Sequence, residues 1–72
     1  MQRAIYQIKD GIKKQIKEKI KFKDLAKKVG INSGYISQIM NGRKASKVIA
    51  YSITKAVSPD LEIKDLFEEK LK

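Results

Sequence analysis

The stretch FKDLAKKVGINSGYISQIMNG, residues 22–42, decides the expected fold of this chain. Its apolar residues recur at helical spacing in two short runs, and Gly30 separates the two runs. Glycine just past a helix is a common left-handed stop, and Asn32 or Ser33 can cap the helix that follows. The stretch therefore predicts two short helices joined by a tight turn.

The inner residues of these helices have the spacing of a helix pair that crosses steeply. The first helix, over about residues 22–28, has the small residue Ala26 at its middle, which lets the second helix cross closely. The second helix, over about residues 33–41, places Ile36 and Ile39 on its inner side. We expect these residues to be buried.

The outward side of the second helix is polar and uncharged. From Val29 to Gly42 there is no Lys, Arg, Asp or Glu, and Tyr35 lies at the edge of the polar side. Asn and Gln can pair with adenine, Ser can pair with several bases, and cations on the flanks suit phosphates. The pattern is typical of a helix that enters the DNA major groove, and an ordinary solvated helix face is the alternative. The outward residues are Asn32, Ser33, Gly34, Ser37, Gln38 and Asn41.

The net charge of +9 is unevenly spread over the 72 residues. Residues 1–28 hold ten basic and three acidic side chains, and residues 29–57 hold four basic and none acidic. Residues 58–72 hold three basic and five acidic side chains. A polyanion, either nucleic acid or an anionic membrane, is the natural partner of the first two segments, and a merely soluble surface is the alternative.

Outside the central stretch, apolar spacing predicts three more helices. Ile5, Ile8, Ile12 and Ile16 form one helical stripe, which predicts a helix over about residues 3–18. The lysines on another side of this helix, at positions 9, 13 and 17, are expected to be solvated and far from the DNA groove.

Two further helices are expected after residue 45. Ser46 can cap a helix over about 46–57, which the run Ser58-Pro59-Asp60 ends. A last helix over about 62–70 presents Ile63, Leu66 and Phe67. The prediction is a single all-α domain of five helices over residues 1–72, with a helix-turn-helix at helices two and three.

Residues 22–42 resemble the helix-turn-helix of the Cro/C1 family, also called the lambda-repressor-like or Xre family. The run LAKKVGI, the run Tyr-Ile-Ser-Gln-Ile and the closing Asn-Gly carry the match, and IKDLF at 63–67 looks like the closing helix of the family. The resemblance covers about residues 5–68. It implies a compact five-helix domain that binds double-stranded DNA sequence-specifically, as a Cro-like or Xre-type repressor of a phage or mobile element.

The resemblance also implies roles for individual residues. It implies base contacts from Ser33, Ser37, Gln38 and Asn41, and DNA backbone contacts from Lys23, Tyr35, Asn41, Arg43 and Lys44. The chain departs from the family at Phe22 and Ser33, where many members have Gln, and at Met40, where many have Glu. The paired-Gln clamp of the family is therefore not carried over.

Composition limits the other classes of function. The chain has no Cys and no His, so disulfides and zinc or thiol sites built on them are excluded. With no Gly-rich phosphate loop or clustered carboxylates, we expect no enzyme activity, no cofactor and no metal. No signal peptide or apolar span of about 20 residues is visible, which favours a cytoplasmic protein.

Partners other than DNA also follow as expectations. A weak homodimer is expected through the last helix, with Phe67 and Leu71 as contact residues. The same frame also serves in protein-interaction modules, such as antitoxins or antirepressors, in which the recognition helix meets a protein. A membrane-surface helix over residues 1–20 is a third hypothesis.

Overall fold

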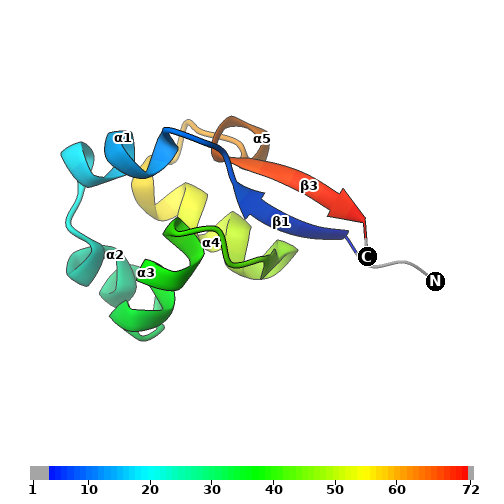
Figure 1. Cartoon of the computed structure of the whole chain (residues 1–72). Coiled ribbons are helices and arrows are strands. Elements are labelled where there is room, and N and C mark those ends of the chain that lie inside the picture. Colours follow the sequence, from blue (N-terminus) through cyan, green and yellow to red (C-terminus); the bar gives the residue numbers. More distant parts are fainter. Residues whose placement is uncertain (1–3, 72) are drawn as a thin grey trace.

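The computed structural model, which describes residues 4–71, combines five helices with a small antiparallel sheet (Figure 1). The predicted all-α class is therefore wrong, because the domain is α+β. The elements are β1 (Ala4–Ile8), α1 (Ile12–Lys19), α2 (Phe22–Val29), α3 (Ser33–Met40), β2 (Ala45–Ser46), α4 (Lys47–Val57), α5 (Ile63–Leu66) and β3 (Phe67–Leu71).

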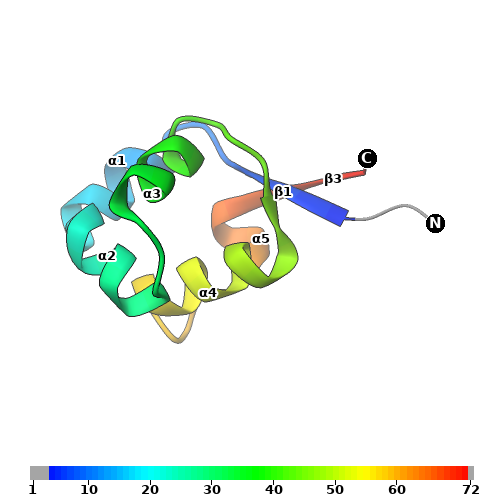
Figure 2. The same ribbon diagram turned by 90° about the horizontal axis from the view of Figure 1, so that it is seen from below.

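The sheet joins the two ends of the described chain. Its strand order is β2-β1-β3, and β1 runs antiparallel to both neighbours. Tyr6 is opposite Ala45 in β2 and opposite Glu69 in β3. The helices group on one side of the molecule, and β1 and β3 extend away from them side by side (Figures 1 and 2).

The first predicted helix is wrong over its N-terminal half. Residues Ala4–Ile8 form a strand, and α1 begins only at Ile12. The break lies at Gly11, whose φ of +83° belongs to the left-handed region that glycine adopts at little cost. In the strand, alternation places Tyr6 in the core with an exposed fraction of 8%. The isoleucine stripe therefore spans a strand, a turn and a helix.

The last predicted helix is wrong over its C-terminal half. α5 ends at Leu66, and the next five residues pair with β1. Phe67 begins that strand and is only 1% exposed. The expected dimer contact at Phe67 is therefore not available, because this ring is part of the core of the monomer. The side chain of Leu71, the other expected contact, lies outside the described residues.

The central helices confirm the predictions made from residues 22–42. Gly30 has a φ of +84°, and its N–H and that of Ile31 both donate to the Ala26 carbonyl, at 2.7 and 3.1 Å. Asn32 caps α3, since its Oδ1 accepts a hydrogen bond from the Gly34 N–H at 2.6 Å. Ser46 caps α4 in the same way by accepting from the Ile49 N–H at 3.4 Å.

The core lies where the helices meet the base of the sheet. Leu25, Ile36, Ile39 and Ile53 are fully buried, as is Ile16 of α1. Burying an aliphatic side chain of this size is worth about 1.5–3 kcal/mol relative to leaving it exposed. The predicted inner side of the central helices is thus confirmed. Its burial leaves the opposite side of α3 facing solvent.

Candidate nucleic-acid interface

The outward side of α3 presents four of the predicted contact residues on one accessible face. Ser33, Gln38 and Asn41 are exposed, and Ser37 is half-buried. Residues 33, 37 and 41 are four apart, so they lie one above the other along the helix. Met40, where the Cro/C1 family often has Glu, is buried and turned away from this face. The structure therefore brings together the residues that the sequence singled out for base contacts.

Three side chains converge at the C-terminal end of this face. The Arg43 guanidinium lies over the Tyr35 ring, with Cζ 4.9 Å from the ring centroid. Arg43 Nη1 donates a hydrogen bond to Gln38 Oε1, and the Arg43 backbone N–H donates to the Gln38 carbonyl at 3.0 Å. We call Tyr35, Gln38 and Arg43 the Arg43 cluster. Arg43, which follows α3, is thereby held against it.

The Arg43 cluster determines which hydrogen-bonding groups point outward. Because Gln38 Oε1 already accepts from Arg43, the side-chain amide has its Nε2 hydrogens left to offer. Asn41 is in a similar state, since its Oδ1 accepts from Lys13 Nζ at 2.6 Å. Each amide therefore keeps its N–H donors for a ligand of this face, while one of the two lone pairs of its oxygen is already used.

Two residues near the N-terminus support α3, and the sequence did not indicate either of them. Lys13 of α1 reaches Asn41, although its helix side was expected to be far from the groove. Gln7 of β1 donates through Nε2 to the Gly42 carbonyl at 2.7 Å. These contacts cross 28 and 35 residues of sequence. Both contacts depend on how β1 and α1 lie against α3. The prediction of a single helix over residues 3–18 did not contain that arrangement.

A polar hollow adjoins these contacts beside the end of α3. It has a volume of about 520 Å³, and Lys9, Lys13 and Asn41 are among its lining residues. Asp10 and Glu68 also line it, so the hollow carries two lysines and two carboxylates.

The remaining predicted backbone contacts stand at both ends of the helix pair. Lys23 is exposed in the first turn of α2, and Lys44 is exposed just after α3. The N-cap residue of α2 makes no side-chain cap, so the first N–H groups of this helix remain available to an anion. Phe22, at the position where many Cro/C1 proteins have Gln, is half-buried, and Lys17 Nζ lies 5.7 Å from the centroid of its ring.

Comparisons of the chain with protein-family models, curated proteins and solved structures find no significant match. Within residues 4–71, no helix has the length and apolar character needed to cross a membrane.

Proposed function

We propose that this chain is a sequence-specific double-stranded DNA-binding transcriptional regulator that places α3 in the major groove. The observation that carries the proposal is the uncharged polar side of α3, together with exposed or half-buried cations on the neighbouring segments: Lys13 of α1, Lys23 of α2, and Arg43 and Lys44 after α3. The resemblance of residues 22–42 to the Cro/C1 family supports a Cro-like or Xre-type repressor of a phage or mobile element.

The distribution of charge suits a groove better than it suits a flat polyanion. The major groove is about 12 Å wide and admits one helix, whose outer side then meets base edges. A lysine on that side would attract phosphate from any sequence, whereas Ser and amide groups make directional hydrogen bonds. Lys23 and Lys44, at the ends of the helix pair, are placed to contact the phosphates on either side. Specificity and affinity thus come from different residues.

The Arg43 cluster favours guanine over adenine at the position that Gln38 reads. A bidentate contact of Gln with adenine needs its Oε1 to accept from the adenine amino group. In this structure Oε1 already accepts from Arg43, which uses one of its two lone pairs, so the Nε2 hydrogens are the less engaged groups of Gln38. Guanine offers two acceptors, N7 and O6, in the major groove, whereas adenine pairs one acceptor with a donor. Arg43 keeps further N–H groups for the predicted phosphate contact.

Arg43→Ala tests this assignment directly. Without Arg43, Gln38 Oε1 is released, and the preferred base at one position is expected to change from guanine to adenine. The difference between the two bases should amount to about 1–3 kcal/mol, the usual value of a bidentate base contact. Selection of binding sites from a random DNA library by both proteins measures the change. Lys44→Ala is the matched control, and it should weaken binding without changing the preferred sequence.

The general proposal is tested by titrating selected and random DNA at several salt concentrations. About five phosphate contacts predict that log K falls with log salt at a slope of about −4 to −5. The selected sequence should also bind at least about a thousandfold more tightly than random DNA. Equal affinity for the two DNAs would contradict the proposal and favour the protein-interaction role, as in an antitoxin or antirepressor.

A further inference from the structure

The chain leaves α3 through a tight turn at Gly42. The Gly42 N–H donates to the Ile39 carbonyl at 3.1 Å, and the Arg43 N–H donates to the Gln38 carbonyl at 3.0 Å. Together with the φ of +110° at Gly42, these two bonds form a Schellman ending, in which a residue of positive φ folds the chain back on its helix. The turn therefore returns Arg43 to the side of Gln38.

The peptide unit between Gly42 and Arg43 is held at both ends. Its N–H donates to α3, and its carbonyl, which belongs to Gly42, accepts a hydrogen bond from Gln7 Nε2 at 2.7 Å. A peptide unit is planar, so two hydrogen bonds at opposite ends fix its orientation. That orientation sets the direction in which the Arg43 side chain starts, because the Arg43 Cα lies in the same plane.

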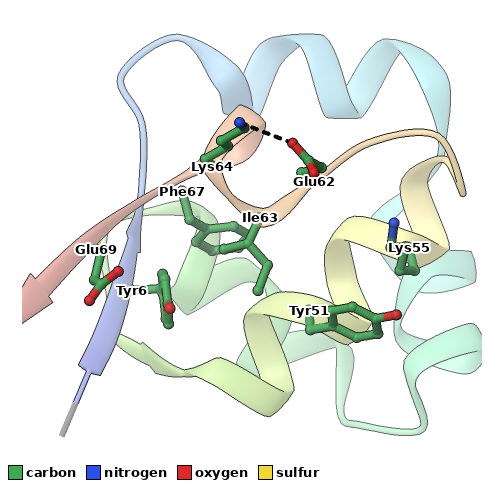
Figure 3. A pocket seen from close by; sticks show the side chains of 8 residues that line it. All are labelled: Tyr6, Tyr51, Lys55, Glu62, Ile63, Lys64, Phe67 and Glu69. Atoms are coloured by element: carbon green, nitrogen blue, oxygen red, sulfur yellow. Dashed lines mark ion pairs between the residues drawn. The ribbon is translucent and has the colours of Figure 1, made fainter.

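Gln7 reaches the turn because of its position in β1. Successive side chains of a strand point to opposite faces. Tyr6 lies on the face that lines a hollow of about 400 Å³, together with Phe67 (Figure 3). Gln7 therefore lies on the opposite face, beside the end of α3, where it is half-buried and lines the polar hollow next to Asn41.

The segment that follows the turn is anchored to β1 a second time. Ala45, the first residue of β2, pairs with Tyr6, the neighbour of Gln7. Arg43 and Lys44 are thus two exposed residues of a short loop whose ends are held by consecutive residues of one strand. They are also the two cations after α3 that are expected to contact the DNA backbone.

We propose that Gln7 is a positioning residue of the DNA interface, which sets the base preference of Gln38 through Arg43 and does not itself touch DNA. This role rests on the proposed function of α3. Without the hydrogen bond from Gln7, the peptide unit before Arg43 can rotate, and the guanidinium spends less time on Gln38 Oε1. The preference for guanine should then weaken, in the same direction as in Arg43→Ala and by less.

Three variants isolate the hydrogen bond of Gln7. Gln7→Met removes the donor and keeps the approximate length of the side chain. Gln7→Lys supplies a different donor to the same carbonyl and should keep most of the wild-type preference. Gln15→Met makes the first exchange at an exposed position of α1 and is the matched control. The readout is the ratio of the affinities for two duplexes that differ by guanine or adenine at the position that Gln38 reads.

The ratio should fall about threefold in Gln7→Met, against about tenfold or more in Arg43→Ala. In the Arg43→Ala background Gln7→Met should change the ratio no further, because its effect passes through Arg43. A loss of stability alone would weaken binding to both duplexes alike. An unchanged ratio in Gln7→Met, a full additional effect in the double variant, or a ratio as low in Gln7→Lys as in Gln7→Met would overturn the proposal.

A second measurement needs no DNA and separates this role from the proposed function. NMR of the free protein follows the exchange of the Arg43 backbone amide and the resonances of the Gln38 side-chain amide. In Gln7→Met the Arg43 amide should exchange about two- to tenfold faster, as expected for the loss of one hydrogen bond, and the Gln38 resonances should shift toward those of Arg43→Ala.

The two measurements fail in different ways. If these NMR changes occur and the wild type shows no base preference, the proposed function fails and the positioning of Arg43 by Gln7 stands. If Gln7→Met leaves both NMR signals unchanged, Gln7 does not position Arg43, whatever the DNA titrations give.

Discussion

The α3 face and the β3 edge are two exposed polar surfaces of this domain, and their charges are arranged differently. α3 has no formal charge, and Arg43 and Lys44 follow at its end. β3 carries acids and a lysine along one strand, with opposite charges two residues apart. The first arrangement suits a partner such as a DNA groove, in which charged phosphates flank uncharged base edges that differ from one sequence to another. The second arrangement pairs a carboxylate with a lysine on the same strand.

The two surfaces also differ in what holds them in place. α3 packs on α2, which is close in sequence, through residues such as Leu25, Ile36 and Ile39. β3 is held by pairing with β1, whose residues lie about sixty positions away in sequence, and by the ring of Phe67. A substitution that removes the long-range contacts of β3 should therefore disturb the β3 edge more than the α3 face. A substitution in the local packing of α2 and α3 should do the reverse.

The largest effect is expected from Phe67→Ala. Removing a fully buried phenylalanine side chain costs about 3–5 kcal/mol, and a domain of this size has about 4–11 kcal/mol of stability in total. The loss should release β3 from the core before it disturbs α2 and α3. Urea unfolding followed by circular dichroism measures the free energy of unfolding. Tyr51→Ala is the control, because Tyr51 is 52% exposed, and a similar loss in both variants would contradict the prediction.

A smaller effect is expected at the two turns that lead into α1 and α3. Gly11 and Gly30 have φ values of +83° and +84°, and a Cβ on either would meet nothing within 4 Å. Alanine should therefore cost about 1–2 kcal/mol at each position, through backbone strain alone. Asparagine, which tolerates this conformation better, should cost less at both. A much larger loss of stability for Gly30→Ala than for Gly11→Ala would contradict this expectation. It would show that the α2–α3 pair depends on its turn more strongly than the β1–α1 connection does.

The smallest effect is expected from Lys13→Ala, and it concerns DNA affinity rather than folding. Lys13 is proposed to contribute one phosphate contact while it holds Asn41. Its removal should reduce the magnitude of the salt slope by about one unit and weaken all sequences alike. Lys14→Ala removes an exposed lysine from the same helix and is the matched control. Equal slopes for wild type and Lys13→Ala would remove Lys13 from the interface.

Elements that are specified by nearby residues could be predicted from the sequence, and elements that depend on distant residues could not. The spacing of α2 and α3, the stop at Gly30 and the cap at Asn32 are signals contained within a few residues, and they were predicted. The strand Ala4–Ile8 was not predicted, because its isoleucines match a helical period until Gly11 interrupts it. Short apolar runs near a helical period are ambiguous in this way.

The candidate site shows the same division. The outward residues of α3 follow from its own periodicity, and all of them except half-buried Ser37 are exposed as expected. The hydrogen bonds from Gln7 and Lys13 depend on where β1 and α1 lie relative to α3. No local pattern encodes that placement. The bond between Arg43 and Gln38 was missed for a different reason, since both residues were assigned to DNA and not to each other.

Selection of binding sites from a random DNA library, by the wild-type protein and by Gln38→Ala, tests the central claim most directly. Gln15→Ala, which removes an exposed glutamine from α1, is the matched control. The wild type and Gln15→Ala should enrich the same short, two-fold-related sequence at about 0.15 M salt, where non-specific binding is weak. Gln38→Ala should lose the preference at one position of each half-site. No enrichment by the wild type, or an unchanged sequence with Gln38→Ala, would contradict the placement of α3 in the major groove.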